Sequence, residues 1–376
     1  MAAVDSKTKT RSLAATACGI RAKQRPGVSI ITEALVQKVL FNETTATGVK
    51  VVTGGGAHTI EAKKEVILSC GALNTLNILE LSGIGNKEIL DRYRISVVVV
   101  VDNSNIGENL QDHLMTGISF EEATKLYYEH NAGPLTIGSV QSTAFMSCLD
   151  ENGARDEKHI KDLMDRFLSD TDDRDQAIRD IFEQPDSPTW AQFMFICQAN
   201  LHETGTTFVV QKLLPGNSIS LGVVQGIPFS RGSVHISSAN VEYKSTVNPR
   251  YFSHALDLEI MARNLLDVEK LHKVEPLSQF LKPNGRRNHS GAFLTNLESA
   301  QKYLCDTATT TYHPYGTADM LPRAEGGVVD EKPRVHGTTK LRVCDASILP
   351  LITVGNIIST VYTVAERAAE IIKAEA

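Results

Sequence analysis

The sequence predicts an α/β protein with two domains, one of which is assembled from both ends of the chain. Short apolar runs and alternating stretches, which are typical of strands, occur near both termini. The middle of the chain is less regular and is densely charged in places. This order indicates a discontinuous domain of residues 1–113 and 322–376, with a second domain, residues 114–321, inserted between its halves.

The chain begins with strand-like segments. Alternating apolar and polar residues predict strands at residues 28–31, 36–41 and 47–52, and a return strand at 58–62. Three consecutive glycines, Gly54 to Gly56, separate the last two of these strands. A phosphate-binding loop would be followed by a helix, whereas a strand follows here, so these glycines predict a hairpin in a three-stranded meander.

The next segment predicts an alternation of strands and helices. Residues 65–71 form a continuous apolar run that ends in Gly71, which is typical of a strand buried on both faces. Helical spacing follows at residues 74–81, and a Ser-Gly-Ile-Gly sequence ends it. A second helix is expected at residues 87–92, and a strand at 97–101.

The inserted domain is expected to hold an antiparallel sheet flanked by helices. Residues 151–183 are densely charged and predict solvated helices with an apolar inner stripe. Alternation predicts strands at residues 218–224 and 232–237. Apolar residues at helical spacing predict amphipathic helices at residues 256–275, 297–305 and, at the C-terminus, 359–374.

The composition excludes several classes of function. The chain has 376 residues and a net charge of −6, and it contains no long run of Lys or Arg, so nucleic acid is not an expected partner. Apolar runs are too short for a membrane span, and residues 1–11 lack the apolar stretch of a secretory signal, so we expect a cytoplasmic protein. The six cysteines are scattered, which predicts neither a metal site nor a disulfide framework.

Two polar residues near the C-terminus are the candidate catalytic groups. His313 stands in a Tyr-His-Pro-Tyr-Gly-Thr sequence, and Asn356 follows Gly355. Alcohol oxidation needs a base that takes the hydroxyl proton and a second polar group that holds the same oxygen, and these two residue types can supply them. The chain contains no Gly-x-Gly-x-x-Gly at a strand-to-helix turn, which is the usual seat of a dinucleotide pyrophosphate.

Several sequence motifs resemble those of the glucose-methanol-choline (GMC) oxidoreductases. Residues 71–85 resemble the second family signature, with Leu76 where the family usually has proline. Further motifs follow in the family's order at residues 106–113, 230–234, 248–251, 327–330, 334–337 and 341–347. The resemblance implies a partial FAD-binding Rossmann-like domain with an inserted substrate domain. It also implies that the chain corresponds to the C-terminal two-thirds of a member, without the N-terminal ADP-binding βαβ unit.

The resemblance assigns roles to individual residues. His313 matches the catalytic base, and Asn356 matches a second position that holds the alcohol oxygen. The residues that match cofactor-binding positions for FAD are Val36, Asp345, Ala346, Gly355, Asn356, Ile357 and Ile358. His113 lies in a motif whose role we interpret as structural. The implied partners are a small-molecule alcohol and an electron acceptor, which is oxygen or another acceptor.

Three functions remain open from the sequence. The first is FAD-dependent oxidation of a primary or secondary alcohol, by hydride transfer to flavin N5. The second is a non-redox cyclisation on the same fold, with His313 as a simple acid/base. The third is an inactive, truncated protein. Aromatic residues that could line the substrate pocket weakly favour an aromatic alcohol or another apolar biosynthetic intermediate: Phe193, Phe195, Phe208, Phe229, Tyr312 and Tyr315.

Overall fold

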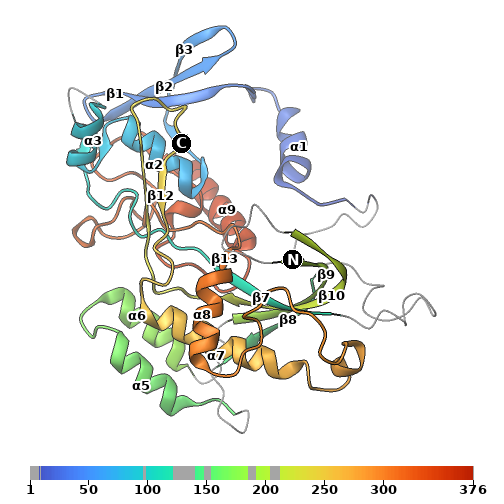
Figure 1. Cartoon of the computed structure of the whole chain (residues 1–376). Coiled ribbons are helices and arrows are strands. Elements are labelled where there is room, and N and C mark those ends of the chain that lie inside the picture. Colours follow the sequence, from blue (N-terminus) through green and yellow to red (C-terminus); the bar gives the residue numbers. More distant parts are fainter. Residues whose placement is uncertain are drawn as a thin grey trace.

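The chain folds into two parts, each of which contains both helices and strands. A computed structural model describes residues 8, 10–95, 99–121, 140–147, 154–184, 192–203 and 212–375. In Figure 1 the upper part carries β1, β2, β3 and α2, and the lower part carries β7 to β10 with α5 to α8. The C-terminal helix α9 lies beside α2, and its Val364 packs against the same core as Leu76 of α2. The predicted α/β class is confirmed.

The first sheet is the predicted three-stranded meander. Its antiparallel order is β1 (Leu35–Asn42), β2 (Thr45–Thr53) and β3 (Gly56–Glu61). The glycines form the β2–β3 hairpin as expected, since Thr53 pairs with Gly56. The strand predicted at residues 28–31 is wrong: this segment is irregular, and Ile30 and Ile31 are more than half exposed, so their alternation has no sheet to face.

Two short parallel strands from opposite ends of the chain lie at the centre of the upper part. β4 (Val66–Leu68) pairs in parallel with β14 (Leu341–Val343). Leu68 is buried and packs in the first core, but Ile67 is 43% exposed. The prediction of a strand buried on both faces is therefore wrong, because only one face of β4 is covered within the described residues.

Helices and strands after β4 follow the predicted alternation. α2 (Gly71–Leu81) begins three residues earlier than predicted, and α3 (Lys87–Tyr93) begins at the cap residue Asn86, whose side chain accepts from Glu88 N–H. β5 (Ile84–Gly85) pairs in parallel with β6 (Val101–Asp102). The predicted strand at 97–101 lies partly outside the described residues.

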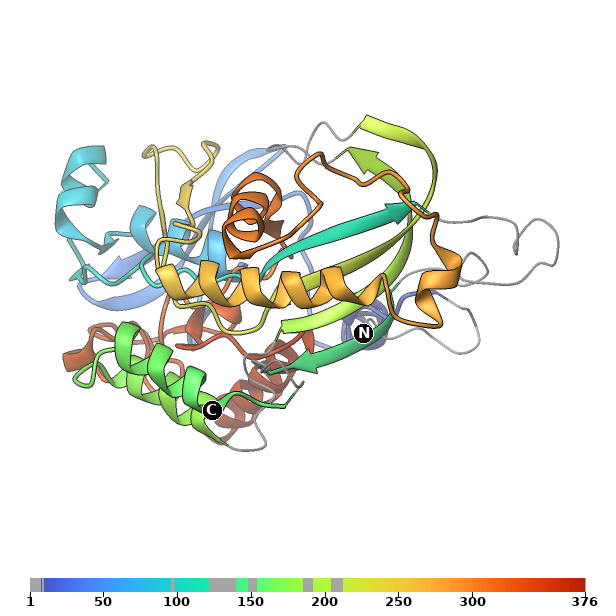
Figure 2. The same ribbon diagram turned by 60° about the horizontal axis from the view of Figure 1, so that its bottom comes forward.

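The inserted region holds an antiparallel sheet that includes the strand predicted at residues 218–224. The strand predicted at 232–237 is not part of it, because residues 233–235 pair with residues 246–248 in a separate two-stranded sheet. The strand order of the larger sheet is β13-β7-β10-β9-β8. These strands are β7 (Leu114–Glu121), β8 (Val140–Met146), β9 (Gln192–Glu203), β10 (Lys212–Gln225) and β13 (Thr309–Thr310). Helices α7 (Ala255–Leu271) and α8 (Leu297–Thr307) pack against β7 and β10, and Figure 2 shows α7 lying along the sheet.

The charged segment forms two short helices, as its spacing predicts. They are α5 (Glu157–Phe167) and α6 (Asp173–Glu183), each capped by an aspartate side chain. Their apolar residues pack with Phe229 and Leu256 in a separate cluster. One of the charges is not simply solvated, because Arg174 of α6 forms a 2.6 Å ion pair with the buried Asp319.

The remaining elements are short, apart from the C-terminal helix. They are a π-helical turn (Ala15–Gly19), α1 (Ile20–Lys23), β11 (Ser233–His235), β12 (Thr246–Asn248), three 3-10 turns (Leu277–Phe280, Arg323–Glu325 and Ala346–Ile348) and α9 (Ile358–Glu375). The predicted inner face of α9 is mostly half exposed, and Ala368 is the helix's one buried residue. Among the described residues, no helix is both long and apolar enough to cross a bilayer.

A histidine between two carboxylates joins α2 to β11. His235 binds the buried Glu80 through Nδ1 at 2.8 Å and Glu108 through Nε2 at 3.1 Å. Glu80 also accepts the backbone N–H of Ile236 at 2.8 Å. Burial alone would lower the pKa of His235, but the hydrogen bonds to Glu108 and Glu80 outweigh it and raise the pKa to about 9. The imidazolium is therefore part of the folded state at neutral pH.

We predict that His235 makes folding stability fall as the solution becomes alkaline. The pKa rises on folding from 6.5 to about 9, so the folded state holds a proton that the unfolded chain has released. This contribution to stability is fully present below pH 6.5, the pKa of the unfolded chain, and is lost as the pH rises through about 9, the pKa of the folded state. Urea unfolding at about pH 6 and about pH 9 measures it. His235→Gln should flatten this dependence, whereas His58→Gln, on the exposed β3, should not; equal pH slopes in both variants would contradict the assignment.

We further predict that Leu76→Ala destabilises the fold by about 2–5 kcal/mol. Leu76 is completely buried in the core shared by both chain ends, so truncation leaves a cavity there. Leu35→Ala is the matched control, because Leu35 is 43% exposed. Chemical denaturation of the two variants gives the comparison, and similar losses from both would mean that α2 does not organise this core.

Candidate active site

The backbone of His313 is held by a buried aspartate. His313 follows β13 in a loop, and its N–H donates to Asp112 Oδ1 at 3.0 Å. The other carboxylate oxygen, Oδ2, accepts from the Tyr251 hydroxyl at 2.7 Å and from Thr310 Oγ1 at 2.5 Å. Since Asp112 stands two residues before β7, this carboxylate ties the His313 loop to the antiparallel sheet.

The side chain of His313 faces a second histidine. Nδ1 of His313 lies 2.9 Å from Nδ1 of His113, and the two rings meet edge to face with centroids 5.1 Å apart. His113 is completely buried, and its Nε2 lies 2.9 Å from the carbonyl oxygen of Gly226. Burial lowers the pKa of His113 to about 3, and the neighbouring His313 acts in the same direction. His113 is therefore neutral across the physiological range.

His313 is itself a neutral imidazole that can accept a proton. Partial burial lowers its pKa, and the charge of Asp112 offsets part of that effect. Within the described part of the chain, the hydrogen bonds of its ring all involve Nδ1, with His113 Nδ1 and with Thr311 Oγ1, each at 2.9 Å. Nε2 is therefore the nitrogen available to a substrate.

Gln111 fixes the segment that leads to Asn356. Its Nε2 donates to the Pro350 carbonyl at 2.9 Å, and its Oε1 accepts from Ile352 N–H at 3.1 Å. Gln111 N–H also donates to the Tyr315 carbonyl at 3.0 Å. The segment then reaches Gly355, at φ +86°, and the exposed Asn356 just before α9. Three consecutive residues, Gln111 to His113, thus position both candidate catalytic loops.

The predicted cofactor residues Asp345 and Ala346 lie at the carboxyl end of β14. The Asp345 carboxylate accepts Gly71 N–H at 3.0 Å and Thr75 Oγ1 at 2.6 Å through Oδ2. Through Oδ1 it accepts the N–H and hydroxyl of Ser347 at 2.8 and 2.6 Å. The carbonyl of Ala346 accepts Gly316 N–H at 3.1 Å, which brings the His313 loop to this strand end.

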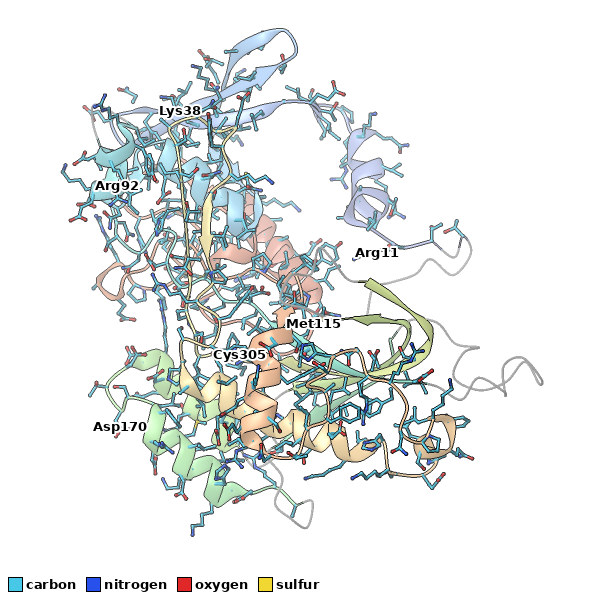
Figure 3. The ribbon with its side chains drawn as sticks, in the orientation of Figure 1. Arg11, Lys38, Arg92, Met115, Asp170 and Cys305 are labelled. Carbon is cyan, nitrogen blue, oxygen red and sulfur yellow. The ribbon has the colours of Figure 1, made fainter. Side chains whose placement is uncertain are left out.

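The other predicted cofactor residues lie on two separate elements, β1 and the start of α9. Ile357 and Ile358 are half-buried at the start of α9, whereas Val36 lies on β1 in the meander and packs against the first core. Figure 3 places Met115 of β7, two residues after His113, between the upper part labelled at Lys38 and the lower part labelled at Asp170. The site therefore lies where the two parts of the molecule meet.

Two of the aromatic residues predicted to line a pocket are instead packed in hydrophobic clusters. Phe229 stacks on Phe182 and His254 in the core beside α5 and α6. Tyr315 is completely buried against Ala346 and Ile352. Tyr312, next to His313, is open to solvent, at 67% exposed. The side chains of Phe193 and Phe195, and the whole of Phe208, lie outside the described residues.

Two family models, both described as GMC oxidoreductase, match residues 1–115 and residues 228–365. Together they cover more than half of the chain, including every candidate catalytic residue.

The chain belongs to the GMC oxidoreductase family. Among similar curated proteins, GMC oxidoreductase family protein Mala s 12 of Malassezia sympodialis is 33% identical over 93% of this chain and 56% of its own length. Human mitochondrial choline dehydrogenase is 30% identical over 94% of this chain and 55% of its own. The chain thus spans about half the length of these relatives. A solved FAD-dependent oxidoreductase from Chaetomium thermophilum superposes with a TM-score of 0.79 at 25% identity, over 99% of this chain and 66% of that one.

Sequence reasoning missed the residues that hold His313 in place. Asp112 and His113 were part of a recognised family motif, but their 200-residue separation from His313 left no local signal of contact. The signal that could have revealed them is their position: two adjacent titratable residues stand directly before a strand of the inserted sheet. Tyr251, which binds Asp112, likewise lay in a family motif without an assigned role.

The geometry at the ends of β4 and β14 fits the flavin part of FAD. Ligands of open α/β sheets bind beyond the carboxyl ends of parallel strands. There Ser69 and Cys70 are exposed, and a Cβ built on Gly71, at φ +81°, would meet no atom within 4 Å. The open backbone at Gly71, the strand end at Ala346 and the start of α9 are the parts of this chain that could hold the cofactor.

We predict that Asp345→Asn destabilises the protein, because an amide NH₂ must then face N–H and O–H donors. Each buried donor left without an acceptor costs about 1–3 kcal/mol. Asp330→Asn is the matched control, since Asp330 accepts two backbone N–H groups through Oδ1, which asparagine retains. Denaturant unfolding of both variants measures the difference. Equal stability of the two would show that the Asp345 contacts do not join the chain ends.

Proposed function

We propose that this protein oxidises an alcohol with FAD as the hydride acceptor and His313 as the base. The observation that carries the proposal is a neutral, half-buried imidazole with its Nε2 available, in a loop that hydrogen-bonds to the end of a parallel strand. The names of the relatives, an FAD-dependent oxidoreductase and a choline dehydrogenase, support the cofactor and the reaction class.

The protein would bind the alcohol and remove its proton. Bound FAD would accept the hydride from the alcohol carbon. Nε2 of His313 would take the hydroxyl proton, for which a pKa near or below neutrality is suited. Asn356 would donate its amide N–H to the alcohol oxygen, since an amide can hold an alkoxide but cannot act as a base. The N-terminus of α9 would stabilise negative charge beside it.

The same proposal assigns parts of the chain to cofactor and substrate. Residues 1–113 and 322–376 would form the cofactor side, because the first core draws its residues from both segments. Residues 114–321 would shape the substrate pocket. Phe145 of β8, whose ring lies 3.8 Å from a Cβ built on Gly355, would be one apolar wall next to Asn356. A primary or secondary alcohol with an apolar or aromatic group suits such a wall, and oxygen or another acceptor would reoxidise the flavin.

The test is reduction of bound flavin by alcohols in the absence of oxygen. The purified protein is loaded with FAD, freed of excess by gel filtration, and mixed with a panel of primary, secondary and aryl alcohols while flavin absorbance is followed. His313→Gln should slow bleaching by about 10²–10⁴-fold, because it removes the general base. His58→Gln, an exposed histidine of β3, is the control and should react at the wild-type rate.

Each contrary result has a definite meaning. A protein that stays colourless after loading would remove the redox proposal. Bleaching at the wild-type rate in His313→Gln would leave the redox reaction but remove His313 as its base. Conversion of a substrate without any flavin bleaching would favour the non-redox cyclisation instead.

A further inference from the structure

We propose that His113 is a positioning residue that fixes the single proton of neutral His313 on Nδ1, so that Nε2 carries the lone pair that meets the substrate. The inference deepens the proposed function and rests on it for the catalytic role. The tautomer itself follows from hydrogen-bond donors and acceptors within the protein.

The argument starts at a group that can only accept. Two backbone groups, of Gly226 and Thr353, act on the His113 ring as acceptors. The carbonyl oxygen of Gly226 is the one at hydrogen-bond distance, 2.9 Å from Nε2, so Nε2 must carry a proton to bond with it. His113 is buried and neutral, so it has one ring proton. Its Nδ1 is then a bare acceptor. The facing Nδ1 of His313, 2.9 Å away, must therefore be the donor.

The other tautomers leave buried lone pairs facing each other. If His313 carried its proton on Nε2, two unprotonated Nδ1 atoms would stand 2.9 Å apart. If His113 then moved its own proton to Nδ1, the bare Nε2 would face the Gly226 oxygen at 2.9 Å. Either arrangement replaces a hydrogen bond with repulsion at a buried site, which is costly. Only one assignment of protons gives a donor and an acceptor in both contacts, between the Gly226 oxygen and His113 Nε2 and between the two Nδ1 atoms.

Thr311 gives independent support from the other side of the ring. Its hydroxyl donates to the backbone carbonyl of His113 at 2.9 Å, and its oxygen lies 2.9 Å from Nδ1 of His313. With its proton on that carbonyl, the hydroxyl oxygen is left to accept from the ring nitrogen. In the assignment fixed by His113, two acceptors, His113 Nδ1 and Thr311 Oγ1, then converge on the same Nδ1–H.

The pairing also keeps the proton on His313 once it is taken. When Nε2 accepts the alcohol proton, the resulting imidazolium still donates through Nδ1 to His113, and a hydrogen bond from a cation is stronger than a neutral one. His113 does not take that proton over, because burial and the neighbouring His313 keep its pKa far below that of an ordinary histidine. Among the described residues, the charged group that acts on His313 is Asp112, which holds its backbone and favours the cation.

The tautomer can be read directly without cofactor or substrate. Protein with ¹⁵N-labelled histidine is examined at neutral pH by long-range ¹H–¹⁵N correlation, which distinguishes protonated from bare ring nitrogens. His313→Gln and His113→Asn identify the two sets of signals among the 11 histidines. We expect a protonated Nδ1 and bare Nε2 in His313, and the reverse in His113. A protonated Nε2 in neutral His313 overturns the inference, whether or not the protein oxidises alcohols.

Two substitutions then separate positioning from mere packing. His113→Asn keeps an acceptor near the position of Nδ1 and should retain the Nδ1–H form of His313. His113→Leu removes the acceptor and leaves the Thr311 hydroxyl, which can turn from the backbone carbonyl of residue 113 to donate, as the remaining partner of Nδ1. The Nε2–H form of His313 should then become populated. If the Leu variant does not fold, as judged by circular dichroism, Thr311→Val removes the other partner of Nδ1 instead. His313 should then remain in its Nδ1–H form, held by His113 alone.

A kinetic comparison adds the catalytic consequence. With the FAD-loaded protein, His113→Leu should lower kcat by roughly tenfold or more with little change in KM, a part of the about 10²–10⁴-fold that a general base supplies. His113→Asn should recover most of this loss. A Leu variant with wild-type kcat and a populated Nε2–H form would overturn the positioning role. A protein that fails to oxidise any alcohol, but shows the expected tautomers, would count against the proposed function alone.

Discussion

The parallel pairing of β4 with β14 is the constraint on which the rest of the structure depends. It places Val66 opposite Leu341, across 275 residues of sequence, and Cys344 N–H donates to Leu68 at the end of the pair. Asp345 then closes the junction by accepting from Gly71 and Thr75 at the start of α2. Because Ala346 next to it accepts from Gly316, the loop that carries His313 is positioned by the same junction. A loss of this pairing would separate the two ends of the chain and move His313 away from the strand ends.

A second level of organisation comes from three neighbouring residues that hold different parts of the site. Gln111 fixes the segment before Asn356, Asp112 fixes the backbone of His313, and His113 fixes its ring. All three stand directly before β7, a strand paired on both sides within the five-stranded sheet. Groups that must hold a fixed geometry are better placed on rigid elements than on loops, so the sheet supports the two loops that carry the candidate catalytic residues.

The fold was predictable where local pattern decided it. The hairpin glycines predicted the meander, and apolar spacing predicted α2, α5, α6, α7 and α8, because these features depend on neighbouring residues alone. The exposure of Ile67, the open face of α9 and the absence of a strand at residues 28–31 were not predictable, since each depends on what packs there from elsewhere. His313 was found through its motif, whereas its contact with His113 joins residues 200 apart and has no local signature. The boundaries at residues 113 and 322 stay a prediction.

The uncovered face of β4 has a consequence for how the protein behaves in solution. Ile67 stands open on a strand that, among the described residues, is paired only with β14, and Leu35 and Ile60 of the nearby meander are also exposed. A short strand with apolar side chains and free peptide groups can accept a strand from a neighbouring molecule. Self-association at high concentration is therefore expected, and a charged residue in place of Ile67 should reduce it.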